Sequence, residues 1–153
     1  MPESGGSDIP VTIQVMTLTD YDSVSRLLTS IPGLTMRSAD SREAIERYLA
    51  RNPGLSFVAR SDNRVVGCVL CGHDGRRGYL QHLAVESALR RQGIGTALVT
   101  HCLDALRDFG IEKVHIDVLV DNTLAHEYWT NSGWKERTDI TRYSFSNSTD
   151  PNA

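Results

Sequence analysis

A glycine-containing run between an apolar strand pattern and a long amphipathic helix pattern constrains this chain more than any other feature. The run covers residues 90–98 (RRQGIGTAL), and the strand pattern before it covers residues 79–85. Glycines at the start of a helix leave backbone N–H groups free for phosphate oxygens, and the helix dipole favours the same anions. The run therefore predicts a ligand with a pyrophosphate. The helix pattern places apolar residues at helical spacing: Ile94, Ala97, Leu98, Cys102, Ala105 and Phe109.

A dinucleotide-binding fold uses a similar order of strand, glycine turn and helix. Asp121 stands where such a fold places an acidic residue after its second strand. Leu98, however, occupies the position of the third glycine, and residues 86–92 separate the glycines from the strand. The spacing therefore disfavours a nicotinamide cofactor.

Two motifs in the correct order resemble the signatures of the GNAT family of N-acetyltransferases. R-x-x-G-x-G at residues 90–95 resembles the family's acyl-CoA loop, and residues 83–85 resemble its splayed fourth strand. Residues 122–125 (NTLA) and 129–134, with their aromatic residues and glycine, resemble its second signature. The resemblance extends from about residue 11 to about residue 145. It implies an α/β fold in which helices flank a central mixed, mostly antiparallel sheet.

Length and composition fit one domain of this size. The chain has 153 residues and a formal net charge of -3, without the basic face of a general nucleic-acid binder. No apolar stretch approaches the length of a membrane span. We expect one domain over residues 11–145, with flexible tails at residues 1–10 and 146–153. The assembly state stays open, a homodimer included.

Three cysteines bear on redox and metal chemistry: Cys68, Cys71 and Cys102. The first two have C-x-x-C spacing, but they fall in a strand pattern, where residues three apart point to opposite faces. No second pair completes a zinc site, so we expect no metal. The odd count and the polar N-terminus favour reduced thiols in the cytoplasm.

Hydrophobic periodicity and turn residues predict the order of elements. Helices are expected from residue 19 or 20, from residue 40 or 41, from about residue 94 until Gly110, and over residues 123–131. Asp40 and Glu43 have the spacing of a capping box. The expected strands cover residues 11–16, 56–60, 64–73, 79–85, 113–120, 134–139 and 142–145.

The cofactor residues follow from the loop and from the resemblance. Backbone N–H groups of residues 92–96 can hold a pyrophosphate, and Arg90 or Arg91 can add a charged contact. The resemblance implies that residues 83–85 pair with the pantetheine arm like an additional strand. Asn122 either lies near that arm or caps a helix. The complete predicted set is Leu83, Ala84, Val85, Arg90, Arg91, Gln92, Gly93, Ile94, Gly95, Thr96, Asn122 and Trp129.

Acetyl transfer also needs a base for the amine and benefits from an acid for the departing thiolate. His82 is the first candidate base, because histidine titrates near neutrality; a hydrogen-bonded sheet histidine and a water chain are the alternatives. His115 is a weaker candidate. Many family members place a tyrosine seven residues after the motif asparagine, where this chain has Trp129. Tyr128, about 100° further around the helix, is expected to pack in the core. Either Tyr128 or Tyr143 then substitutes, or the thiolate leaves unassisted.

The resemblance implies an acetyl-CoA-dependent N-acetyltransferase without a metal. A primary amine of a small molecule or of a protein N-terminus attacks the thioester directly, through a tetrahedral intermediate. The alternative is a non-catalytic acyl-CoA-binding module of the same fold. Residues 31–40, the turn 74–77 and the region of Arg137 and Tyr143 are expected to line the acceptor site. Arg76 and Arg77 are either solvated turn residues or ligands of a carboxylate.

Overall fold

One mixed sheet organises the fold of this computed structural model, which describes residues 10–153; the predicted tail at residues 1–10 therefore lies almost entirely outside the described residues. The strands follow the order β1-β2-β3-β4-β5, antiparallel except for the parallel pair β4 and β5. Their bounds are β1 Thr12–Val15, β2 Phe57–Ser61, β3 Arg64–His73, β4 Gly78–Val85 and β5 Val114–Ile116. The predicted mixed, mostly antiparallel sheet is confirmed.

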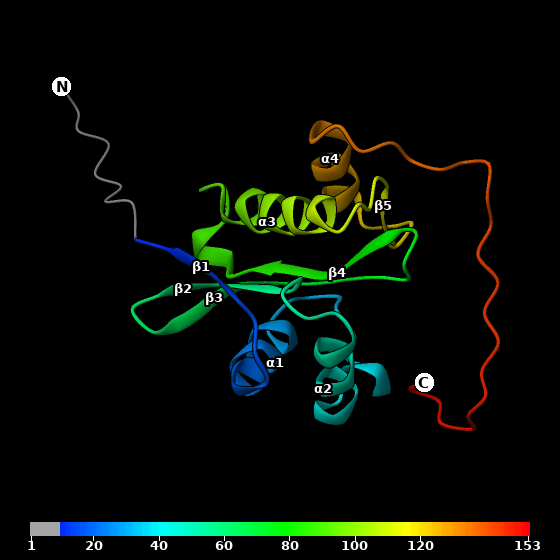
Figure 1. Ribbon diagram of the computed structural model, residues 1–153, viewed down its shortest axis with the longest axis horizontal. Helices are drawn as coiled ribbons and strands as arrows, with labels where there is room; N and C mark the ends of the chain where they lie inside the picture. The colour runs from blue at the N-terminus through cyan, green and yellow to red at the C-terminus, as the bar shows by residue number, and fades with distance from the viewer. Residues whose placement is uncertain (1–9) are drawn as a thin grey trace.

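Helices cover both faces of the sheet (Figure 1). The two helices nearer the N-terminus pack on one face and the two later helices pack on the other, and each pair has its own hydrophobic core. Three short 3-10 segments precede or connect them: η1 Leu18–Asp20, η2 Ser38–Asp40 and η3 Ser87–Leu89. The four helices are α1 Tyr21–Thr29, α2 Arg42–Arg51, α3 Ile94–Asp108 and α4 Thr123–Asn131.

The side chains of β3 alternate between the two cores, as the strand pattern predicts. Cys68 packs into the core beneath α1 and α2, whereas Cys71 packs with Cys102 into the core beneath α3. All three thiols are buried and free. Residues 10–153 hold no cluster of His, Cys, Asp and Glu suited to a metal ion. The C-x-x-C spacing therefore belongs to a strand that is buried on both sides.

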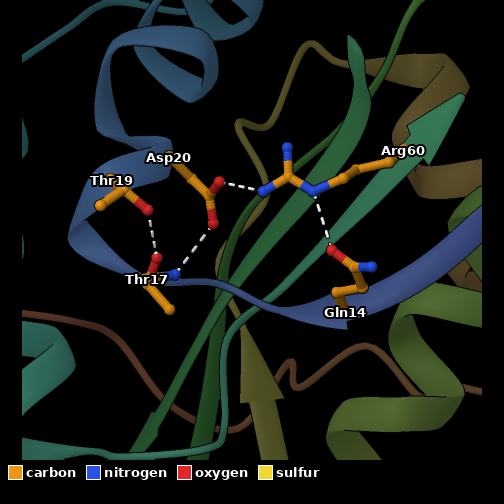
Figure 2. Close-up of polar contacts among 5 residues, drawn as sticks. All are labelled: Gln14, Thr17, Thr19, Asp20 and Arg60. Carbon is orange, nitrogen blue, oxygen red and sulfur yellow. Dashed lines mark hydrogen bonds and ion pairs between the residues drawn. The ribbon is translucent and has the colours of Figure 1, made fainter. Parts of the chain in front are cut away.

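The start of α1 is attached to the sheet by a buried ion pair (Figure 2). Asp20, only 5% exposed, accepts a hydrogen bond from the backbone N–H of Thr17 at 2.9 Å and pairs with the guanidinium of Arg60 on β2. Arg60 Nε also donates to Gln14 Oε1 on β1 at 2.8 Å. These contacts satisfy the buried carboxylate and fix α1 relative to the first two strands.

The predicted capping box at α2 is wrong. Ser41 is the N-cap, and its hydroxyl accepts from Ala44 N at 3.2 Å. Asp40 lies one residue earlier, at the end of η2, where its Oδ2 accepts from Arg37 N at 2.9 Å. The carboxylate of Asp40 is thereby free of α2 and available to a different element.

The C-terminal part of the chain departs from the prediction. β5 ends at Ile116, and residues 134–145 form no strand and do not pair with the free edge of β5. Ile140, Tyr143 and Phe145 are highly exposed. The chain then returns to η2, where Ser38 donates to the Asp150 carboxylate and to the carbonyl of Asn152. That residues 146–153 are flexible stays a prediction.

In residues 10–153, every helix is too short or too polar to span a bilayer.

Candidate active site

A bulge separates β4 from its parallel neighbour. β4 pairs with β5 only from Gly78 to Leu80. Its register on β3 then shifts, so that His82 and Leu83 both lie opposite one residue, Val69. His82 adopts a positive φ of 51°, as a bulge residue can. A bulge bends and twists its strand. The edge of β4 that faces away from β3 therefore has no partner strand at residues 81–85 among the described residues.

The start of α3 has the form of an anion site. Gly93 is the N-cap, with a φ of 81°, and no side chain caps the helix. The first helical hydrogen bond runs from Ala97 N to Gly93 O at 2.9 Å. The N–H groups of Ile94, Gly95 and Thr96 therefore have no acceptor within the helix. They point out of the first turn, as the sequence predicts for a pyrophosphate.

Three elements meet at Gly95. A Cβ added there would lie 3.6 Å from Val85 Cγ2, at the end of β4, and 3.8 Å from the hydroxyl of Tyr128 on α4. Arg90 Nε donates to the carbonyl of Val85 at 3.3 Å, which holds the loop against the strand end. The structure thus brings together two segments of the predicted cofactor set, residues 83–85 and residues 90–96.

Trp129 lies in the core and Tyr128 faces α3, the reverse of what the sequence predicts. Trp129 is buried, with its ring centroid 4.7 Å from that of Trp134, so the hydrophobic core holds it. Tyr128 instead brings its hydroxyl to the start of α3, 3.2 Å from Thr96 Oγ1. Because the two residues differ by about 100° around the helix, only one of them can face α3. Tyr143, the other predicted substitute, lies 93% exposed in the segment without regular structure.

Asn122 is the N-cap of α4, as one of the two predicted alternatives holds. Its side-chain oxygen accepts from Ala125 N at 3.1 Å. That bond satisfies a free N–H of the first helical turn. A contact of Asn122 with the cofactor stays a prediction.

His82 forms a pair with Asp40. His82 Nε2 lies 2.6 Å from Asp40 Oδ1, and the side chains are 22% and 7% exposed. The Arg37 N–H binds the other carboxylate oxygen, and Tyr21 donates its hydroxyl to the Asp40 carbonyl at 2.7 Å. Asp40 is thus held from two sides and orients the imidazole at the bulge. Sequence reasoning did not pair Asp40 with His82, since nothing local relates it to a strand 42 residues later. His115, the weaker candidate, stacks on Tyr79 at 5.8 Å between ring centroids.

A groove of about 480 Å³ opens between α2 and β4, next to this pair. It includes residues 39 and 40 of the predicted acceptor lining. The turn 74–77 is not part of it: Asp74 Oδ1 accepts from the N–H groups of Arg76 and Arg77 at 2.8 Å and closes the turn. Sequence reasoning missed the contribution of α2. The charged side chains of its lining are Asp40, Arg47 and Arg51.

Comparison with known proteins gives one consistent family. Residues 22–134 match the model of the acetyltransferase (GNAT) family. N-alpha-acetyltransferase 30 of Schizosaccharomyces pombe is 32% identical, over 69% of this chain and 74% of the yeast protein. Acetyltransferase ECA0875 of Pectobacterium atrosepticum is 37% identical over 54% of this chain, which spans 59% of that relative's length. Among solved structures, the aminoglycoside N-acetyltransferase AAC(6')-Iy in complex with CoA has a TM-score of 0.72 at 18% identity, with 89% of this chain and 95% of that chain covered.

Proposed function

Because this chain belongs to the acetyltransferase (GNAT) family, we propose that it transfers the acetyl group of acetyl-CoA to the N-terminal amine of a peptide, with His82 as the base. The observation that carries the proposal is the contact of His82 with Asp40: His82 lies on β4 where the strand loses its parallel partner, and Asp40 reaches it from the end of η2. The cofactor edge and the acceptor groove both border this point of β4.

The residues present fit acetyl-CoA. Free N–H groups of Ile94, Gly95 and Thr96 would hold the pyrophosphate, and the absence of a side chain at Gly95 keeps the space between Val85 and Tyr128 open. The unpaired edge at residues 83–85 would bind the pantetheine amides as a strand does. When bound there, acetyl-CoA supplies the acetyl group as a thioester that an uncharged amine can attack.

His82 takes up the proton that the acceptor ammonium must lose. An imidazole whose one nitrogen faces a carboxylate is fixed in orientation, and the positive charge it gains is stabilised by that carboxylate. Asp40 supplies the carboxylate, which the N–H of Arg37 holds in place while Tyr21 binds the backbone carbonyl of the same residue. Asp40 is therefore a positioning residue, and His82 is the residue that faces the amine.

Tyr128 is the proposed proton donor to the departing thiolate. Its phenol hydroxyl reaches the start of α3, where it forms a hydrogen bond with the hydroxyl of Thr96. A phenol can donate a proton, whereas the indole N–H of Trp129 cannot serve as a useful acid. The hydroxyl of Tyr128 thus takes the role that many family members give to the next position along the chain.

Two observations support a peptide acceptor over an aminoglycoside. The fission-yeast relative at 32% identity is an N-alpha-acetyltransferase, whereas the aminoglycoside enzyme is related at 18% identity. The groove also presents Arg47 and Arg51, while its one carboxylate, Asp40, already faces His82. A polycation finds no free carboxylate among these lining residues.

Two measurements test the proposal. Calorimetric titration with acetyl-CoA should give binding, and titration with NADH should give none. Mass spectrometry of a peptide with a free N-terminus should then show one acetyl group on its α-amine after incubation with enzyme and acetyl-CoA. Binding without transfer to any peptide or small amine would support the non-catalytic module instead. A lack of binding would remove the cofactor assignment.

A further inference from the structure

We propose that the groove between α2 and β4 selects peptides that carry an acidic side chain between their third and fifth residues, and that Arg47 and Arg51 bind this side chain. The inference rests on the proposed function, because it concerns the acceptor of the same site. It adds a sequence preference that the family assignment does not contain.

Arg47 and Arg51 lie one helical turn apart on the face of α2 that lines the groove. Both are exposed, and neither forms an ion pair with any of residues 10–153. Like charges at this spacing destabilise a helix slightly. An anionic ligand between the two arginines would remove that repulsion and gain charge-assisted hydrogen bonds.

The charge of the groove points to the same ligand. Its lining holds two arginines and a single carboxylate, that of Asp40. Asp40 is bound to His82, so its charge is compensated at the other end of the groove. Glu43 and Glu46 belong to the same helix but do not line the groove. One end of the groove therefore holds Asp40, whose charge faces His82. Along α2 the groove holds two arginines without a carboxylate among the other lining residues.

Helix geometry sets the spacing between the amine and the acidic group. Arg47 and Arg51 lie about 7.5 and about 13.5 Å along the helix axis beyond Arg42, the first residue of α2, at about 1.5 Å per residue. An extended peptide advances about 3.4 Å per residue. If its amine faces His82, beside Asp40, its third to fifth residues lie along the two arginines. A free α-amino acid is too short for both contacts.

The C-terminal segment of the chain, which carries Asp150, is bound by η2 beside the groove. Ser38, adjacent to groove residue Ala39, donates its backbone N–H to the carbonyl of Asn152 at 2.9 Å and its hydroxyl to the carboxylate of Asp150. η2 can thus bind both the backbone and a carboxylate of a peptide segment.

The test compares two peptides that differ only by Glu or Gln at positions three to five. Thiol release from acetyl-CoA gives kcat/KM for each. The wild-type protein should favour the Glu peptide about 10-fold at low ionic strength and less at high salt. The double substitution Arg47→Gln with Arg51→Gln should bring that ratio close to one. Arg26→Gln on α1, which removes the same charge from a residue that does not line the groove, should retain the ratio.

A second pair of substitutions keeps the test independent of one variant's stability. Arg47→Glu with Arg51→Glu should reverse the preference toward a peptide with Lys at the same positions. Equal kcat/KM for the Glu and Gln peptides in the wild-type protein would overturn the inference, as would a ratio that survives both double substitutions. In those cases peptides are still acetylated, so the proposed function stands. No acetylation of any peptide would instead overturn the proposed function, and the inference with it.

Discussion

His82 Nε2 and Asp40 Oδ1 lie 2.6 Å apart, although 42 residues separate them in the chain. The bulge in β4 turns His82 toward η2, where the N–H of Arg37 binds the carboxylate of Asp40 and the hydroxyl of Tyr21 binds its backbone carbonyl. This arrangement gives the imidazole one fixed nitrogen and leaves Nδ1 without a hydrogen-bond partner among residues 10–153. An incoming amine can lose its proton to a base that is oriented in this way.

Asp40→Asn should lower kcat about 10-fold or more, because an amide cannot stabilise the charge that His82 gains. The KM for acetyl-CoA should change little, since Asp40 does not belong to the cofactor loop. Thiol release over a range of pH measures both constants. Asp22→Asn, which removes an exposed carboxylate that pairs with Arg42, is the control and should behave as the wild type. An unchanged pH profile and kcat in Asp40→Asn would remove Asp40 from the mechanism.

Tyr128→Phe should lower kcat 10-fold or more without weakening acetyl-CoA binding, because it removes the proton donor and keeps the ring in place. Thr96→Val removes the other partner of the 3.2 Å contact but leaves the phenol present. Thr96→Val should therefore retain most of kcat. Equal losses of kcat in both variants would mean that the hydrogen bond matters for structure and that the phenol donates no proton.

Gly95→Ala should weaken acetyl-CoA binding, whereas Gly93→Ala should lower the stability of the fold. A methyl group at Gly95 meets Val85 and Tyr128 at ordinary contact distances, so the variant should fold normally. It should nevertheless bind acetyl-CoA at least 10-fold more weakly, because the methyl group holds the ligand away from the backbone. Gly93 has a φ of 81°, and alanine there should cost about 1 kcal/mol of stability. Urea unfolding and calorimetry separate the two effects; normal acetyl-CoA affinity in Gly95→Ala would contradict this.

The buried thiols should respond to pH in a defined direction. Burial raises the pKa of Cys68 to about 12 from an ordinary value of 9.0. Below about pH 9, both folded and unfolded states keep the proton, so Cys68 leaves stability unchanged. Above pH 9 the unfolded thiol ionises first, and stability is lost until the pH passes the folded pKa. Urea midpoints from pH 8 to pH 10.5 should therefore fall more steeply in the wild type than in Cys68→Ala. Parallel slopes would show that Cys68 does not contribute.

The form of the helix start at Gly93 was predictable from the sequence because its signal is local. Gly93 and Gly95 lie at the start of a helix whose apolar spacing is unambiguous, and both the helix and its exposed N–H groups are present. The opposite faces of Cys68 and Cys71 followed from the period of a strand in the same way. Where one element alone decides a feature, the pattern of residues was sufficient.

Features that depend on two distant elements were not predictable. Asp40 has the spacing of a helix cap, and only the folded chain shows that Ser41 caps α2 while Asp40 meets His82. The choice between Tyr128 and Trp129 depends on how α4 packs against Trp134, which no periodicity of a short helix determines. The strands expected at residues 134–145 do not form, because an alternating pattern becomes a strand only when a neighbour pairs with it, and a local pattern does not identify that neighbour.

The measurement that tests the central claim most directly is the acetylation rate of His82→Gln beside His115→Gln, with saturating acetyl-CoA and one acidic peptide. His115 stacks on Tyr79 on the neighbouring strand and has no place in the proposed chemistry. The rate of His82→Gln should fall at least 100-fold with acetyl-CoA affinity retained, because general-base catalysis contributes about 10²–10⁴ in rate. His115→Gln should keep most of the wild-type rate. A His82→Gln protein that acetylates the peptide at the wild-type rate would contradict the assignment of His82 as the base.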